Sequence, residues 1–354
     1  MLDLFSRYRD QEISMCFCSK VNLRIVILLF CALLISSPAH AKSKYQFKIA
    51  TIAPEGSIWT TRFRDFATEV GEKSKGEIQF KIYPGGIMGD DRSVYRKMRI
   101  GQLHGGGFTM TGIGRTVGDF RVMGLPFLFR SYEEVDHVKK GLWPLFSKAF
   151  AGKGLELIAM TEVGFVYSMS TSPVATLEEL QKRKIWAPEG DPISIAYLQT
   201  LGITPLPLTV PDVLTSLQTG MVETVFNSLY GSIVLQWFTK TKYITDIPFG
   251  YAYGGLLLDR KKFLKLPDDY QSMIKETALK HFSELIADTR KSNNDSRKVL
   301  KDNGVSMVNP DPEGLKTMRE MSKKTAKQMQ GTAFSQEIYQ ETTKLLEDFR
   351  KQAK

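Results

Sequence analysis

From Tyr45 onward, short segments of alternating apolar and polar residues are separated by longer segments with helical spacing. Every second residue from Tyr45 to Ile52 is apolar, which predicts a strand with one side facing solvent. Ser57 can cap a helix that runs to about Lys75. A strand, a helix and a glycine-rich strand follow over residues 78–83, 91–101 and 105–111. This β-α-β-α-β order predicts a parallel sheet covered by helices, with ligands binding where the strands end.

The same alternation resumes near Leu155 and indicates a second α/β unit. Strands are expected over residues 155–160, 165–171, 184–186 and 222–226, and helices over 176–182, 193–201 and 211–219. Two units of the same kind predict two lobes with a cleft between them.

A long helical pattern begins at Pro267, and no helix-breaking residue follows before Gly304. A helix of about 35 residues would be roughly 50 Å long, because each residue adds about 1.5 Å. This length exceeds one lobe, so the helix is expected to span both.

The first 41 residues have the pattern of a signal peptide. Lys20 and Arg24 precede an apolar run over residues 25–35, and the small residues Ala39 and Ala41 follow. We therefore expect cleavage after Ala41 and export to the periplasm, with translation starting at either Met1 or Met15. The apolar run is shorter than the ~20 residues that span a bilayer, and no later segment is longer, so a membrane-spanning protein is not expected.

Composition adds little until this cleavage is considered. The chain has 354 residues, a formal net charge of +10 and three cysteines, all of which precede Ala41. The exported chain would therefore have no disulfide and no thiolate nucleophile or metal ligand. Lys and Arg are spread along helix faces without interleaved aromatic residues, so a nucleic-acid partner is not expected.

No catalytic or metal-binding motif stands out. His104, His137 and His281 have no second histidine three to five residues away, as a helical metal site would need. Glycine-rich phosphate loops and the Gly-x-Ser-x-Gly elbow are also missing. We therefore expect a binding protein without metal, cofactor or enzymatic activity. An exported hydrolase with an unrecognised site is the alternative.

Three segments resemble one family in their order and spacing: residues 53–57 (Ala-Pro-Glu-Gly-Ser), 124–129 (Gly-Leu-Pro-Phe-Leu-Phe) and 217–223, which leads to Asn227. The chain resembles the solute-binding proteins of tripartite ATP-independent periplasmic (TRAP) transporters, in the branch that includes C4-dicarboxylate binders. The resemblance implies a two-lobed, periplasmic-binding-protein-like α/β fold with a ligand cleft between the lobes and a long helix spanning both. It also implies a monomer that closes over a small organic solute and delivers it to the membrane subunits of a TRAP permease.

The expected domain organisation follows from this fold. After the signal peptide (1–41), residues 42–162 would begin the first lobe and 163–250 the second. Residues 251–288 would return to the first lobe and enter the spanning helix, and 289–354 would complete the second lobe with the C-terminal helices. The hinge is expected near residues 162–164 and 250–253.

The chain departs from the family at the residues that usually bind a carboxylate. Trp186 stands where the family usually has an arginine, and Val166 and Tyr167 stand where a second arginine is common. A guanidinium pairs with a carboxylate in bidentate fashion, whereas an indole offers an apolar face and one N–H. A standard C4-dicarboxylate is therefore not expected as the ligand. A carrier of lipid or other hydrophobic or aromatic compounds and a sensory adaptor are alternatives on the same fold.

The residues expected at the ligand come from both lobes. Trp186 and Tyr167 fit either a ligand contact or a core position, and Glu189 fits either the cleft mouth or the cap of the following helix. The full set is Glu55, Trp59, Thr109 and Met110 in the first lobe and Tyr167, Trp186, Glu189, Asn227 and Tyr230 in the second.

Overall fold

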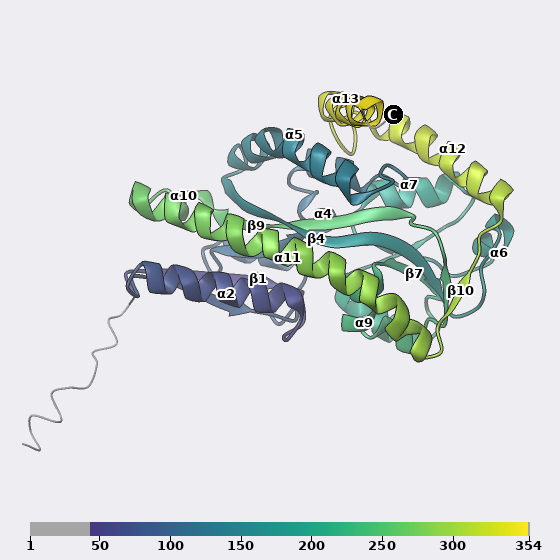
Figure 1. Cartoon of the computed structure of the whole chain (residues 1–354), viewed down its shortest axis with the longest axis horizontal. Helices are drawn as coiled ribbons and strands as arrows, with labels where there is room; N and C mark the ends of the chain where they lie inside the picture. The colour runs from purple at the N-terminus through teal and green to yellow at the C-terminus, as the bar shows by residue number, and fades with distance from the viewer. Residues whose placement is uncertain (1–42, 353–354) are drawn as a thin grey trace, which may run out of the picture. The chain divides into compact units, whose positions relative to one another are not determined.

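The computed structural model describes residues 43–352 (Figure 1). Its strands are β1 (Tyr45–Thr51), β2 (Ile78–Tyr83), β3 (Gly105–Thr109), β4 (Leu155–Ser170), β5 (Trp186–Pro188), β6 (Leu206–Leu208), β7 (Thr224–Asn227), β8 (Tyr243–Thr245), β9 (Gly250–Asp259) and β10 (Ser306–Val308). Its α-helices are α2 (Ile58–Lys73), α3 (Asp91–Arg99), α4 (Met110–Ile113), α5 (Tyr132–Ala151), α6 (Leu177–Gln181), α7 (Pro192–Thr200), α8 (Val213–Gln218), α9 (Leu229–Val234), α10 (Arg260–Phe263), α11 (Asp268–Asp302), α12 (Pro312–Met329) and α13 (Gln336–Gln352). Short 3-10 helices are η1 (Gly118–Gly124), η2 (Val210–Asp212) and η3 (Trp237–Thr239). The expected signal peptide lies outside the described residues.

The first lobe is built on strands β2, β1, β3, β9 and β4, in that order across the sheet. Strands β1, β2 and β3 run parallel, as the sequence predicts, and β9 pairs antiparallel with both β3 and β4. The predicted helix after Ser57 is confirmed, because the Ser57 side chain accepts a hydrogen bond from the Thr60 amide at the start of α2. Phe63, Phe66 and Val70 bury the apolar face of this helix in the core of the lobe.

Strand β4 is longer than the sequence pattern indicates. Residues 155–160 and 165–171 were expected as two strands, but one strand of 16 residues runs from Leu155 to Ser170. Its pairing with β9 shifts register between Glu162 and Gly164. Gly164 has a φ of +109°, and a Cβ there would lie 2.5 Å from Nδ2 of Asn293. A local irregularity that only glycine accommodates therefore interrupts the alternation without ending the strand.

The second lobe uses the far end of β4. There β4 pairs with β7 and β8, and β8 pairs with β10. Strands β5 and β6 form a separate two-stranded parallel sheet. Because β4 belongs to the sheet of both lobes, it connects them directly, and β9 accompanies it over the middle of the molecule.

The long helix is confirmed as α11, with 35 residues. Figure 1 shows α2 alongside its first half and α9 near its second half, and α11 contacts both helices. In the first lobe the Phe282 ring lies 5.1 Å from that of Phe63, while Leu300 is buried in the core of the second lobe. Helix α11 thus packs on both lobes.

The two C-terminal helices pack on different parts of the molecule. Helix α12 contacts α7 of the second lobe, whereas α13 lies on α5 of the first lobe (Figure 1). There Leu345 of α13 packs closely over Gly141 of α5. The division expected from the sequence groups residues 289–354 as the completion of the second lobe and the C-terminal helices. None of the helices within residues 43–352 is both long and apolar enough to cross a membrane.

Candidate ligand-binding cavity

A cavity of about 200 Å³ lies between the lobes, where β1 and β3 end opposite β5 and β7. The first lobe contributes the ends of these strands and the start of α2, and the second lobe contributes β5, α7, β7 and η3. Residues 250–254 of β9 complete the wall. Aromatic side chains dominate the lining: Trp59, Phe63, Phe108, Trp186, Phe226, Trp237, Phe249, Tyr251 and Tyr253.

Several residues expected at the ligand from the sequence line this cavity. They are Trp59, Thr109 and Met110 from the first lobe and Trp186 and Asn227 from the second. Trp59 and Asn227 are 168 positions apart in the sequence, and the fold brings all five residues to one surface.

Two of the other expected residues lie behind or outside the cavity wall. The Glu55 carboxylate is exposed and pairs with the Arg64 guanidinium at 2.6 and 2.9 Å. The Tyr230 ring packs against Trp59 with 5.1 Å between centroids, and its hydroxyl accepts a hydrogen bond from the Ile58 amide at 3.0 Å. Tyr230 therefore supports Trp59 from behind and joins α9 to the start of α2.

Tyr167 and Glu189 also lie outside the cavity lining. Tyr167 on β4 pairs with Asn227 on β7, and its ring lies 6.0 Å from the Arg297 guanidinium. Burial raises the pKa of Tyr167. Glu189 lines a smaller adjoining pocket, where its carboxylate lies 3.4 Å from Arg115 and 3.9 Å from Arg92.

Trp186 is both a core residue and a residue of the cavity lining, the two alternatives that the sequence leaves open. Only 3% of its surface is exposed, and it packs in the core of the second lobe while also lining the cavity. Its Nε1 donates to the Leu208 carbonyl at 3.0 Å, which joins β5 to β6. The indole thus offers a ligand its apolar surface, because its single N–H is already committed.

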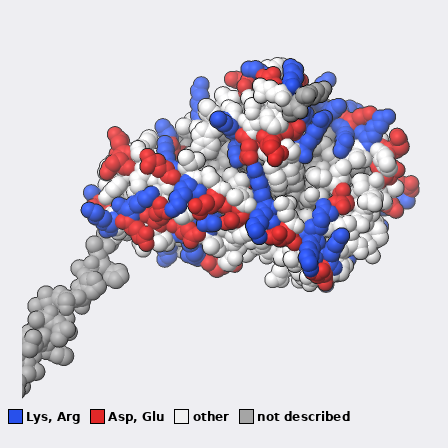
Figure 2. Space-filling view, viewed as in Figure 1, with Lys and Arg blue, Asp and Glu red and all other residues white. Residues whose placement is uncertain are grey.

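No Lys or Arg side chain is among the residues that line the cavity. The one ionisable carboxyl group in the lining is Asp191, which caps α7 by accepting hydrogen bonds from the Ile193 amide and the Ser194 hydroxyl. Burial raises the pKa of Asp191. Figure 2 shows Lys and Arg interspersed with Asp and Glu on the outer surface of the face it displays. The lining therefore supplies no cation to pair with a ligand carboxylate.

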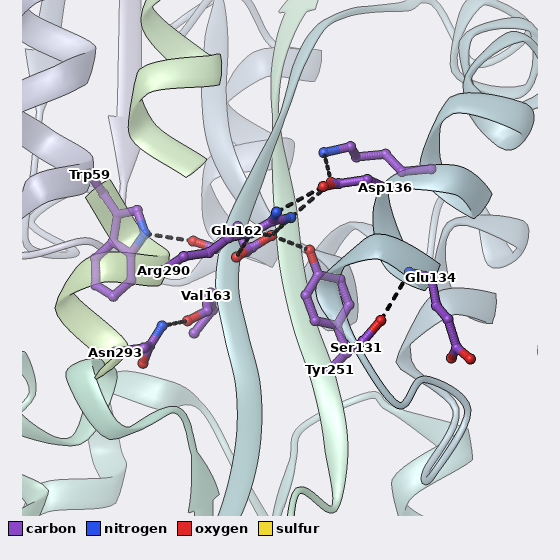
Figure 3. Close-up of polar contacts among 10 residues, drawn as sticks. Trp59, Ser131, Glu134, Asp136, Glu162, Val163, Tyr251, Arg290 and Asn293 are labelled. Atoms are coloured by element: carbon purple, nitrogen blue, oxygen red, sulfur yellow. Dashed lines mark hydrogen bonds and ion pairs between the residues drawn. The ribbon is translucent and has the colours of Figure 1, made fainter. Parts of the chain in front are cut away.

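Glu162 anchors the strand that connects the lobes (Figure 3). Its side chain is fully buried and accepts hydrogen bonds from Arg290 of α11 and from the Tyr251 hydroxyl, both at 2.9 Å. Its backbone carbonyl accepts the indole N–H of Trp59 at 2.8 Å. Arg290 also pairs with Asp136 of α5 at 2.8 Å. Glu162, which Arg290 of α11 holds in place, thus fixes Trp59 and Tyr251 of the cavity wall.

Asn293 makes a second connection from α11 to the same strand. Its Nδ2 donates to the Val163 carbonyl at 3.0 Å, and its Oδ1 accepts the Tyr230 amide at 3.0 Å. The helix α9, which begins two residues after Asn227, is therefore tied to α11 and β4 together.

Sequence reasoning did not identify Trp237, Phe249 or Tyr251 as cavity residues. Trp237 lies in the short 3-10 helix η3, and Phe249 lies in the loop that precedes β9. Neither segment has a regular hydrophobic period, so no pattern marks these side chains as facing the cavity. Over residues 43–352 the structure also contains no group of three His, Cys, Asp or Glu side chains placed to hold a metal ion.

The family profile described as "Bacterial extracellular solute-binding protein, family 7" matches residues 49–332. A solute-binding protein from Chromohalobacter salexigens is 26% identical over 222 residues, which cover 62% of this chain and 64% of that protein. The 2,3-diketo-L-gulonate-binding periplasmic protein YiaO from Escherichia coli is 25% identical over 212 residues, or 58% of this chain and 63% of that protein. Both matches span slightly less than two thirds of the relative's length.

A solved structure has the same fold. It is a TRAP periplasmic solute-binding protein from Desulfovibrio salexigens with bound orotic acid. The TM-score is 0.79 at 22% sequence identity, and the superposition covers 86% of this chain and 98% of that one. The two-lobed architecture expected from the sequence is thereby confirmed.

Proposed function

Because the chain belongs to bacterial extracellular solute-binding protein family 7, the solute-binding proteins of TRAP transporters, we propose that it captures a small organic solute between its lobes. The observation that carries this proposal is the cavity of about 200 Å³, whose lining comes from both lobes and from the strands that connect them. A solute in such a place contacts both lobes at once, so its binding favours the closed arrangement. The volume suits a metabolite better than a lipid. The proteins of this family are receptors, and we propose no catalytic step.

The closing motion would be a hinge at residues 162–164 of β4 and 250–253 of β9. Gly164 and the register shift beside it support this assignment, because of the two register shifts in the pairing of β4 with β9 this one coincides with a glycine of positive φ. The loaded, closed form would then dock on the membrane subunits of a TRAP permease as a monomer. We further propose export to the periplasm with cleavage after Ala41, which the intact mass of the exported chain would test.

The solute is not a standard C4-dicarboxylate in this account. Two carboxylates buried without cations would lose their hydration and gain no compensating ion pair. Two of the similar proteins are named for binding 2,3-diketo-L-gulonate and orotic acid, both of which are acids. An acid in the present cavity would need a partner other than Lys or Arg, since none lines it.

The apolar lining also favours one alternative on the same fold, a carrier of hydrophobic or aromatic compounds. The site residues proposed for either role are those that line the cavity: Trp59, Thr109, Met110, Trp186 and Asn227.

A thermal-shift screen of the purified chain against a broad metabolite library tests the proposal. A true ligand raises the melting temperature in a saturable manner, because it binds the folded state alone. Mass spectrometry of any solute retained through purification identifies the ligand independently. Turnover of generic ester or phosphate substrates, with no stabilising solute in the library, would contradict a binding role.

A further inference from the structure

Three tryptophans line the cavity, and they differ in what their indole N–H groups contact. Trp59 donates to the Glu162 carbonyl at 2.8 Å, and Trp186 donates to the Leu208 carbonyl at 3.0 Å. Trp237 also lines the cavity, and within residues 43–352 its Nε1 donates no hydrogen bond to another residue. The N–H group of Trp237 is therefore available to a ligand, whereas those of Trp59 and Trp186 already donate to backbone carbonyls.

The Trp237 ring is held firmly in place. Only 1% of its surface is exposed, and the ring packs edge-on against Trp186 with 5.4 Å between centroids. Its backbone carbonyl accepts the Thr241 hydroxyl at 3.1 Å, and the preceding residue, Gln236, has a left-handed φ of +59°. Trp237 Nε1 is not among the fully buried polar atoms that lack a partner, so solvent reaches it and an acceptor atom of a bound ligand can take the place of that solvent.

Asn227 offers a second available donor. Its side chain is 8% exposed and lines the cavity, and its Oδ1 accepts the Ser228 amide at 2.8 Å. This contact orients the amide group, and its Nδ2 has no acceptor within the described part of the chain. Two cavity-lining residues of the second lobe therefore each have a neutral N–H group that donates to no other residue of the described chain.

We propose that Trp237 Nε1 and Asn227 Nδ2 orient the solute by donating to its oxygen atoms, and that the solute is an uncharged molecule with hydrogen-bond acceptors on an apolar or aromatic body. This inference rests on the proposed solute-binding function. Neutral donors suit carbonyl, hydroxyl or ether oxygens, which are buried at lower cost than a carboxylate. The aromatic wall provides contact area for the remainder of the molecule.

The nearest competing arrangement is a carboxylate at the adjoining pocket. Arg92 and Arg115 line that pocket, but both face the Glu189 carboxylate, and Asp90 and Asp91 also line it. A ligand carboxylate would have to displace Glu189 from two arginines, so we favour the neutral solute.

Three probes of similar size test the proposal: acetophenone, which has a neutral acceptor, benzoate, which is anionic, and ethylbenzene, which has no acceptor. Ligand-observed NMR titrations measure their dissociation constants for the exported chain. We expect acetophenone to bind most tightly. Trp237→Phe keeps an aromatic ring and removes the N–H, and it should weaken acetophenone binding about two- to tenfold while leaving ethylbenzene unchanged.

Trp143→Phe is the matched control, because Trp143 is exposed on α5 and does not line the cavity, so the same change of side chain there should not alter the affinity for any of the three probes. The proposal is overturned if no probe binds the wild type, if benzoate binds most tightly, or if Trp237→Phe leaves acetophenone binding unchanged. Loss of benzoate binding in Arg115→Ala would then point to the adjoining pocket. A solute that closes the lobes but binds equally well to Trp237→Phe would contradict this inference alone. If no solute closes the lobes, the proposed function itself is contradicted.

Discussion

The Arg290 guanidinium lies 2.9 Å from the fully buried Glu162 carboxylate, at the point where α11 crosses the strand that connects the two lobes. Burial alone would lower the pKa of Arg290, but its hydrogen bonds to Asp136 and Glu162 outweigh that effect and raise it. The Tyr251 hydroxyl and the Trp59 indole bond to the same glutamate residue. The pair therefore links the long helix to two side chains of the cavity wall.

Replacing Arg290 with methionine should destabilise the fold strongly. The substitution leaves the Glu162 carboxylate buried without a cation, and breaking such a pair typically costs about 3–5 kcal/mol. Denaturant titration measures the free energy of unfolding. Lys291→Ala is the control, because Lys291 pairs with Asp295 on an exposed turn of the same helix and should change stability by less than about 1 kcal/mol. Equal, small effects of the two substitutions would contradict the assignment.

Asp91 should give the stability a measurable dependence on pH. It accepts hydrogen bonds from the amide and hydroxyl of Thr109, and burial raises its pKa from 3.8 to about 6. Because its pKa is higher in the folded state, folding takes up a proton between about pH 4 and 6. The penalty of burying the charged form is therefore full above pH 6 and disappears as the pH falls through this window.

Asp91→Asn removes the charge and keeps a side-chain oxygen that can accept a hydrogen bond. Its stability relative to the wild type should be most favourable near pH 7, by up to about 3 kcal/mol, and should lose this advantage by pH 4. Thermal unfolding of both chains across this pH range checks the trend. A difference that does not change with pH would contradict the raised pKa.

Glu189 should slow the release of solute, because its carboxylate in the second lobe pairs with Arg92 and Arg115 in the first lobe and so helps to hold the lobes together. Glu189→Gln should raise the dissociation rate of a solute found by the thermal screen about two- to fivefold at low salt, as expected for a partly exposed ion pair. The effect should fade at high salt. Glu55→Gln is the matched control, because Glu55 pairs with Arg64 within one lobe. Equal effects of the two substitutions would argue against a contact that holds the lobes together.

Trp186→Ala should lower both stability and solute affinity. The ring fills the second-lobe core against Trp237, and truncating a buried tryptophan costs about 3–5 kcal/mol. The loss also frees Trp237 to move within the cavity wall. Calorimetric titration with the screened solute checks the affinity, and an unchanged dissociation constant would show that this part of the wall does not contact the solute.

The sequence predicts elements that depend on local patterns and misses relationships that depend on distant residues. The cap at Ser57 and the absence of breakers between Pro267 and Gly304 are local signals, and both helices form where expected. Glu162 and Arg290 are separated by 128 positions, so nothing in either neighbourhood indicates that they pair. Trp186 illustrates the intermediate case. Its place near the cavity followed from a resemblance, but the commitment of its N–H to Leu208 depends on the pairing of β5 with β6.

Small-angle X-ray scattering of the exported chain tests most directly whether a solute is captured between the lobes without a carboxylate-binding cation. The radius of gyration should fall in a saturable manner when a stabilising solute is added, and it should not change with succinate or malate. A saturable decrease with either dicarboxylate, or no decrease with any stabilising solute, would contradict the account.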